Sequence, residues 1–340
     1  MKKTVRIVAG VACALALSCT MLAGCASTSG SSSASASASA SVSADQKAAD
    51  EVADLIDKIY VQQRTETTDA DCAAAKAAWD KLTPAQQELV EGENADPDYF
   101  GRDTGDATKD DPRNQDNIGD KEILVVSFGT SFNDSRVNDI KGIEDAIATA
   151  NPDWSVRRAF TAQIIINHIQ ARDGEAIDNM DQALARAEKN GVKQLVVQPT
   201  HLMHGAEYDE MMEALKPYES KMQISVAEPM LGPVGATVTE TNDDKVAAAT
   251  AVVDAAVAAS KYASTDAAAA EKTAFVFLGH GTSHAAAITY SQMYNTFQDL
   301  NLPNVFVGTV EGEPEETEVE AVIDACKDAG YENVILRPLM

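Results

Sequence analysis

The stretch FVFLGHGTS at residues 275–283 decides the fold of this chain, because an earlier stretch, LVVSFGTS at residues 124–131, has the same pattern. In each stretch, a continuous apolar run leads to a glycine that threonine and serine follow. An apolar run of this length is typical of a strand that is buried on both faces of a parallel sheet. The chain is therefore expected to contain a similar unit twice.

The repetition extends beyond these two strands. A proline precedes a second expected strand in each unit, at residues 155–160 and 305–310, and a third strand runs into a proline in LVVQP at 195–199 and in VILRP at 334–338. Helical patterns separate the strands, so each unit reads as a βαβ series with parallel strands and right-handed crossovers. The sequence thus predicts an α/β fold of two similar Rossmann-like parallel-sheet halves.

These patterns divide the chain into consecutive segments. They are a lipoprotein signal peptide at 1–24, a Ser/Ala tether at 25–44, a small helical region at 45–90, an acidic linker at 91–120, a first half at 121–240 and a second half at 241–340. The tether has no large apolar side chain and is expected to be flexible. The linker lacks the spacing of a calcium loop and is expected to be solvated. The helical region is expected to be a spacer or to dock a partner.

The first residues indicate export. Residues 1–24 have a positive start and an apolar run that is too short to cross a membrane, as signal peptides do. Leu22, Ala23 and Gly24 precede Cys25 and complete a lipobox, so the Cys25 thiol is expected to be lipidated. The alternative is an ordinary cleaved signal with a chance cysteine. Two acyl chains would anchor the protein to the membrane, on the cell surface or the periplasmic side.

Composition excludes several classes of function. The formal net charge of −26 argues against binding to nucleic acid, which requires a basic surface, and against docking on anionic lipid through basic patches. From residue 25 onward the cysteines are Cys25, Cys72 and Cys326, which lie in different segments and form neither a disulfide framework nor a zinc ribbon. Residues 45–340 are enough for one large domain or two modest ones.

Chemistry is expected just beyond the carboxyl ends of the strands, where open parallel sheets bind ligands. His280 stands there between Gly279 and Gly281, and glycine permits both a tight turn and the close approach of a bulky ligand. A neutral imidazole binds Co²⁺, Ni²⁺, Fe²⁺ or Zn²⁺ and also takes up protons near neutrality. Glu311 ends the neighbouring strand and is expected to add a carboxylate. The plainer alternative is a loop histidine without a ligand.

Other polar positions follow strand ends as well. His201 and His204 follow the third strand of the first half, where they would bind a second metal or ligate a tetrapyrrole axially, or would be loop residues without a ligand. His284 lies about one helical turn beyond His280. It is expected either to contact a metal ligand without binding the metal itself or to stand at the N-terminus of a helix. The remaining candidate contacts come from the first half: Ser127, Gly129, Thr130 and Arg158.

These motifs together resemble the CbiK-type anaerobic sirohydrochlorin cobaltochelatases. The resemblance covers about residues 122–340 and rests on ordered strings: VVSFGTS at 125–131, RAFT at 158–161, GHGTSH at 279–284, GTVE at 308–311 and PLM at 338–340. It implies the class II chelatase fold, in which two Rossmann-like halves face a cleft that holds the macrocycle. It also implies that His280 binds metal and accepts protons and that Glu311 is a second ligand.

The family's second metal-binding histidine lies a few residues after Pro-Leu-Met. The sequence ends at Met340, before that point. Either the sequence is a fragment, or metal is held by one protein imidazole fewer. The first is favoured, because a final core strand normally leads into a helix that covers the sheet.

The resemblance implies insertion of Co²⁺ into sirohydrochlorin in anaerobic cobalamin biosynthesis, without an established organic cofactor. Ni²⁺ and Fe²⁺ suit the same ligands. The substrate's carboxylates need cations, for which the candidates are Arg136, Arg157, Arg158 and Arg172. The competing hypothesis is a lipid-anchored tetrapyrrole- or metal-binding protein that delivers its ligand to a transporter without turnover, which the export signal favours. A homo-oligomer is compatible with either.

Overall fold

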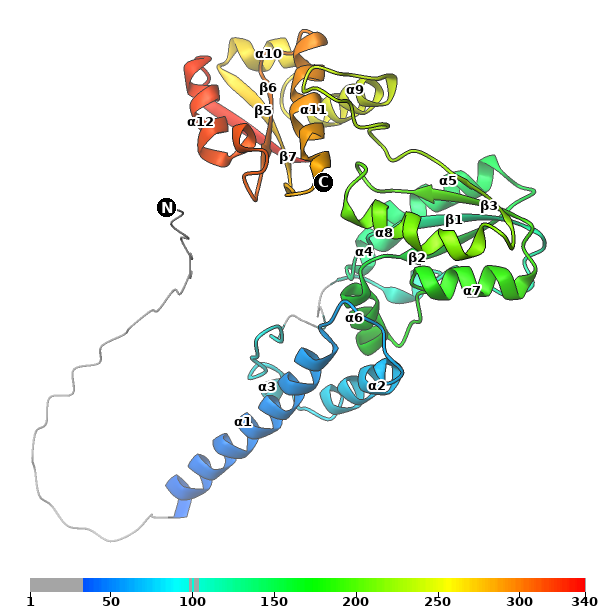
Figure 1. Ribbon diagram of the computed structural model, residues 1–340. Helices are drawn as coiled ribbons and strands as arrows, with labels where there is room; N and C mark the ends of the chain where they lie inside the picture. Colours follow the sequence, from blue (N-terminus) through cyan, green and yellow to red (C-terminus); the bar gives the residue numbers. More distant parts are fainter. Residues whose placement is uncertain (1–32, 98–99, 101–103, 340) are drawn as a thin grey trace, which may run out of the picture. The chain divides into compact units, whose positions relative to one another are not determined.

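The structure is a computed structural model that describes residues 33–97, 100 and 104–339 (Figure 1). The expected signal peptide and Cys25 lie outside the described residues. The chain forms two compact units, Met1–Ala44 and Asp45–Met340, and the second contains both α/β halves. None of the helices in the described part combines the length and the apolar character that crossing a bilayer requires.

Helix α1, Ser33–Ile59, begins inside the expected tether. The chain is therefore helical from Ser33, and the flexible tether predicted for residues 25–44 does not extend over all of them. Alanine has the strongest intrinsic preference for helix, and the segment runs directly into the amphipathic turns of residues 45–59.

The expected small helical region packs against the first half. It contains α1, α2 (Thr68–Trp79) and α3 (Pro84–Gln87), which begins with a capping box formed by Thr83 and Gln86. Helix α2 contacts α6 (Gln163–Asp173) of the first half, and the Asn167 side chain of α6 donates to the Ile59 carbonyl oxygen at 3.0 Å. Because Ala171 of α6 also belongs to the core of this region, the region is a docked part of the protein.

The first half has a four-stranded sheet in which all strands are parallel, in the order β2-β1-β3-β4. Its elements are β1 Lys121–Ser127, α4 Asn133–Ser135, the π-helical η2 Arg136–Ile140, α5 Lys141–Ala150, β2 Ser155–Phe160, α6 Gln163–Asp173, α7 Met180–Asn190, β3 Gln194–Pro199, α8 Ala206–Leu215, η3 Lys216–Tyr218 and β4 Gln223–Val226 (Figure 1).

The second half has a three-stranded parallel sheet in the order β6-β5-β7. Its elements are α9 Asp243–Ala258, α10 Thr265–Ala270, β5 Thr273–Gly279, η4 Ala285–Ala287, α11 Ile288–Asp299, β6 Val305–Thr309, η5 Glu315–Thr317, α12 Val319–Asp328 and β7 Asn333–Pro338 (Figure 1). The predicted pair of α/β halves is thus confirmed, with β1 and β5 as the central strands.

The register of the strands confirms the predicted repeat. In the first sheet Val126 pairs with Pro199, and in the second sheet Leu278 pairs with Pro338. The prolines that end β3 and β7 are therefore equivalent positions. Pairing of the central strand fixes where each following loop leaves the sheet, so the loops after β1 and β5 begin at equivalent points.

The core of the second half also includes residues that precede it in sequence. Leu202 and Met203, which follow β3, and Leu231 pack with Phe275 and Phe277 of β5. The ammonium group of the buried Lys245 side chain donates to two carbonyl oxygens of this connecting segment, those of Leu231 at 3.0 Å and Pro233 at 2.8 Å. These contacts hold the connecting segment against the second half.

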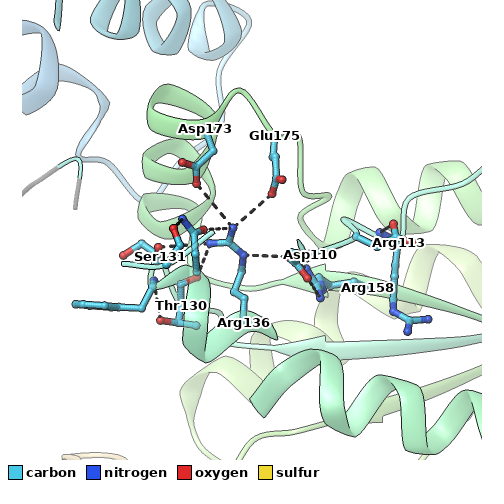
Figure 2. A network of polar contacts seen from close by, with 12 residues as sticks. Asp110, Arg113, Thr130, Ser131, Arg136, Arg158, Asp173 and Glu175 are labelled. Atoms are coloured by element: carbon cyan, nitrogen blue, oxygen red, sulfur yellow. Dashed lines mark hydrogen bonds and ion pairs between the residues drawn. The ribbon is translucent and has the colours of Figure 1, made fainter. Parts of the chain in front are cut away.

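The acidic segment expected to be a solvated linker is in part a structural element of the first half. The Asp110 carboxylate is fully buried and accepts from Arg136 at 2.9 Å and from Arg158 at 2.7 Å (Figure 2). The prediction of solvation was wrong at this position. A buried guanidinium group requires an anionic partner, and the segment before β1 supplies one.

Another buried carboxyl group gives a pH-dependent prediction. Burial raises the pKa of Glu122 to about 7, although Arg157 lies 3.6 Å away, and neither Glu122 oxygen accepts a hydrogen bond within the described residues. Folding therefore promotes proton uptake, so the contribution of this group to stability falls as pH rises from about 4.5 to 7 and is lost above. We expect Glu122→Gln to gain melting temperature relative to the wild type over this interval.

Thermal unfolding at a series of pH values from 4.5 to 8 would measure this difference. Glu66→Gln, at an exposed position of the helical region, is the matched control and should show a constant difference from the wild type. A Glu122→Gln difference that does not change with pH would contradict the assignment.

Candidate functional site

His280 and Glu311 lie together where the strands of the second sheet end. His280 follows β5 directly, and the Glu311 amide, just after β6, donates to the His280 carbonyl oxygen at 2.9 Å. The imidazole Nδ1 is 3.7 Å from the Glu311 Oε1 atom. Both side chains are open to solvent, with 64% and 52% of their surfaces exposed. The expectation that the two side chains lie next to each other is confirmed.

Both positions beside His280 require glycine, one because a neighbouring ring leaves no room for a side chain and the other because of its backbone conformation. A Cβ atom on Gly279 would lie 2.3 Å from the ring of Tyr290, and Gly281 has a φ of +93°, where other residues are strained. The buried Tyr290 hydroxyl accepts a hydrogen bond from the Gly281 amide at 3.2 Å. Packing on Tyr290 and this backbone conformation therefore fix the direction in which His280 leaves the sheet.

The neighbours of the His280 ring determine its tautomer. Nδ1 lies 3.2 Å from the Gly281 carbonyl oxygen, and the other nearby atom is the Glu311 carboxylate oxygen. Both oxygens act as acceptors, so a neutral ring carries its proton on Nδ1. The lone pair on Nε2 is then available to a metal ion or a proton.

A cavity of about 290 Å³ opens beside this pair. Its lining is largely apolar and comes from the ends of β5 and β7 and the residue after β6: Leu278, Gly279, His280, Val310, Leu336, Arg337 and Pro338. Within the described residues, no three His, Cys, Asp or Glu side chains stand close enough to hold a metal ion. Two protein groups leave most coordination positions of a bound cation open to another ligand.

The candidate contacts of the first half have mainly structural roles. Ser127 is buried, and its hydroxyl accepts from Thr200 at 2.8 Å, so the prediction of a substrate contact was wrong there. Gly129 has a φ of +102°, and a Cβ atom would lie 2.5 Å from the ring of Phe160. The Thr130 hydroxyl accepts from the Phe132 amide at 3.2 Å and shapes the loop after β1.

The arginines that were expected to bind substrate carboxylates make contacts within the protein instead. Arg136, Arg157 and Arg158 are fully buried, and Arg158 pairs with both Asp110 and Glu144, which raises the pKa of its guanidinium group despite burial. The prediction that Arg158 contacts substrate was wrong. The sequence offered no signal for these pairs, because Asp110 lies in a run of similar acidic residues.

Two of the arginines hold the loop after β1. Arg136 donates to the carbonyl oxygens of Thr130 and Ser131, both at 3.4 Å, and Arg172 donates to that of Ser131 at 2.7 Å. Figure 2 shows the Arg136 guanidinium group between this loop and the carboxylates of Asp110, Asp173 and Glu175. Hydrogen bonds from these two arginine side chains therefore hold the backbone of the loop in place.

The remaining histidines occupy separate environments. Burial lowers the pKa of His201, and neither of its ring nitrogens has a hydrogen-bond partner within the described residues. His204 lies 2.8 Å from Glu228 and packs against Tyr208 with the two rings tilted by 32° and their centroids 4.4 Å apart. Neither histidine contacts His280 or Glu311 within the described residues.

His284 begins a helix, as one of the sequence expectations stated. Its Nδ1 atom accepts from the Ala286 amide at 3.1 Å, at the start of η4, and its Nε2 atom lies 3.2 Å from the Asp209 carboxylate of α8. With Nδ1 as acceptor, the proton of a neutral ring is on Nε2 and points to Asp209. Asp209 thus helps to hold the loop that carries His280.

Comparison with known proteins gives consistent results. The family model described as cobalt chelatase (CbiK) matches residues 121–340. The chain is 32% identical over 223 residues to the sirohydrochlorin cobaltochelatase of Salmonella typhimurium, which covers 65% of this chain and 75% of that protein. It is 25% identical over 223 residues to the sirohydrochlorin cobaltochelatase CbiKC of Nitratidesulfovibrio vulgaris, covering 65% and 71%.

Proposed function

Because this chain belongs to the cobalt chelatase (CbiK) family, we propose that it is a sirohydrochlorin cobaltochelatase that inserts Co²⁺ into sirohydrochlorin. The observation that carries the proposal is the pair of His280 and Glu311, which stand 3.7 Å apart beside an open, largely apolar cavity. In this reaction the metal ion is a substrate, and it needs to be held only until the macrocycle takes it.

The geometry suits proton removal coupled to metal transfer. Insertion releases two pyrrole N–H protons as bonds from nitrogen to Co²⁺ form, so charge balances. Nε2 of His280 has its lone pair free, because Nδ1 faces two oxygens, and it can accept a proton or coordinate the incoming ion. Glu311 faces Nδ1, so its carboxylate can stabilise the imidazolium that forms when Nε2 takes up a proton and can accept a proton from Nδ1 next.

The test is a spectroscopic assay of turnover. Purified protein, Co²⁺ and excess sirohydrochlorin should show loss of the absorbance of free sirohydrochlorin over many equivalents per protein molecule. Parallel reactions with Ni²⁺ and Fe²⁺ would rank the metals, which imidazole and carboxylate ligands alone do not separate. Catalytic turnover supports the proposal, and its absence with every metal would overturn it.

The export signal of the sequence favours a second candidate, a surface protein that binds a tetrapyrrole or metal and delivers it to a transporter. The same assay separates the two functions. A carrier would bind sirohydrochlorin or Co²⁺ stoichiometrically and would show no turnover. Titration and kinetics on one preparation therefore decide between them.

We also propose that the protein is anchored outside the cytoplasm by lipid on Cys25. The lipobox at residues 22–25 supports this location. Expression in a bacterial host followed by detergent phase partitioning would test it, with Cys25→Ser as the control variant. The wild type should enter the detergent phase, and equal partitioning of both proteins would refute the anchor.

The contact between Asp209 and His284 gives a prediction for the assay. Asp209→Ala removes the acceptor that faces Nε2 of His284, and the loop that carries His280 becomes less well held. Asp209 is largely exposed, so we expect a modest fall in kcat, about 3-fold.

Asp209→Asn should recover most of this rate, because its amide oxygen still accepts a hydrogen bond. Glu210→Ala, an exposed neighbour on α8, is the control and should keep the wild-type kcat. Equal kcat values for Asp209→Ala and Glu210→Ala would show that the contact does not position His280.

A further inference from the structure

The repeat shows which residue of the first half is equivalent to His280 of the second half. At the ends of the central strands, Ser127 pairs with Phe160 in the first sheet, and Gly279 pairs with Thr309 in the second. The register at Pro199 and Pro338 already makes these strand ends equivalent. The residue that follows β1, Phe128, therefore occupies in the first half the place of His280 in the second.

The backbone of the two loops confirms this equivalence. The Ala162 amide donates to the Phe128 carbonyl oxygen at 3.2 Å, as the Glu311 amide does to that of His280 at 2.9 Å. Each loop continues through a glycine with a positive φ, Gly129 at +102° and Gly281 at +93°. The pair of Phe128 and Ala162 is thus the apolar counterpart of the pair of His280 and Glu311.

Phe128 is exposed, and the loop that carries it is held in place, so the loop cannot easily move to bury this side chain. Its side chain is 47% exposed, and Phe132 in the same loop is 59% exposed. The carbonyl oxygens between them accept from Arg136 and Arg172, whose guanidinium groups are buried or nearly so. Large apolar side chains on a fixed loop at a strand end mark a surface that contacts something apolar.

We propose that Phe128 binds the tetrapyrrole, with its ring against the conjugated macrocycle. The inference rests on the proposed function, because it takes sirohydrochlorin as the ligand. Each half would then supply one residue from the same backbone position. The first half supplies the aromatic ring of Phe128, which contacts the macrocycle. The second half supplies the imidazole of His280, which binds the metal and accepts protons. A phenyl ring is suited to a flat, conjugated ligand, because offset stacking adds to the burial of apolar area.

The test measures binding of sirohydrochlorin without metal, by titration of its absorbance or fluorescence. We expect Phe128→Ala to raise the Kd about 10-fold, while Phe128→Trp keeps it near the wild-type value. In turnover assays the same alanine variant should raise KM and leave kcat at saturating substrate within about 2-fold. Ile143→Ala, an apolar position on α5 of similar exposure (41% against 47%), is the matched control and should change neither quantity.

The outcomes separate this inference from the proposed function. If the wild type binds and turns over sirohydrochlorin while Phe128→Ala keeps the wild-type Kd and KM, the inference is overturned and the function stands. If the wild type does not bind sirohydrochlorin at all, both fall. Circular dichroism and melting temperature of each variant establish that it is folded, and Phe128→Gln is a second, polar replacement if the alanine variant aggregates.

Discussion

Replacing His280 with alanine is expected to lower the rate of Co²⁺ insertion into sirohydrochlorin by at least about 10²-fold. The variant removes the imidazole whose Nε2 lone pair is available for the metal and for the pyrrole protons, and general acid–base groups typically contribute about 10²–10⁴-fold. The fold should be intact, because the side chain is largely exposed. The measurement is the initial rate of sirohydrochlorin absorbance loss at saturating Co²⁺.

Chemical rescue makes this test sharper. The missing ring borders a cavity of about 290 Å³, so free imidazole added to the variant should restore part of the rate. Glu320→Gln, an exposed residue on α12, is the control and should keep the wild-type rate. A His280→Ala variant that inserts Co²⁺ at the wild-type rate would eliminate the catalytic role of His280, whatever its effect on binding.

The second large effect concerns stability. Asp110→Ala leaves the guanidinium groups of Arg136 and Arg158 buried without the carboxylate that pairs with both. Removing one partner of a buried ion pair typically costs about 3–5 kcal/mol, because a charge remains in a medium that solvates it poorly. For a domain of this size, the melting temperature should fall by on the order of 10 °C. Thermal unfolding by circular dichroism would measure the change.

The neighbouring Asp111 provides the matched control. It is exposed, and within the described residues it accepts hydrogen bonds from its own segment, from the Arg113 amide and the Gln115 side chain. Asp111→Ala should therefore cost less than about 1 kcal/mol. Similar melting temperatures for Asp110→Ala and Asp111→Ala would mean that the segment is solvated, as the sequence had suggested, and that the buried network does not stabilise the first half.

Asp110 also lies outside the residues that the cobalt chelatase family model matches. The segment before β1 therefore completes the first half of this protein from outside the matched region. Through Arg136 it reaches the loop after β1, because the same guanidinium group contacts Asp110 and the carbonyl oxygens of Thr130 and Ser131. Loss of Asp110 is thus expected to disturb the loop that carries Phe128 as well as the stability of the half.

The sequence by itself determined the doubled α/β architecture and the pairing of His280 with Glu311. Buried parallel strands leave a local signal, a continuous apolar run with a glycine at its end, and that signal occurs twice. Once the strands are known to be parallel and adjacent, their carboxyl ends meet at one edge, so residues that follow them become neighbours. Each step uses information within a few residues of the strand.

Only the tertiary structure decided what the arginines and the acidic segment do. In sequence, Arg158 before a strand end and Asp110 in an acidic run look like available charges, and their pairing joins residues 48 positions apart. Whether a charge is solvated or buried depends on what packs over it, which no local pattern encodes. The alignment of the two strand ends in the sequence already places Phe128 opposite His280. Only the structure shows that Phe128 is exposed, because a phenylalanine directly after a buried strand is more often part of the core.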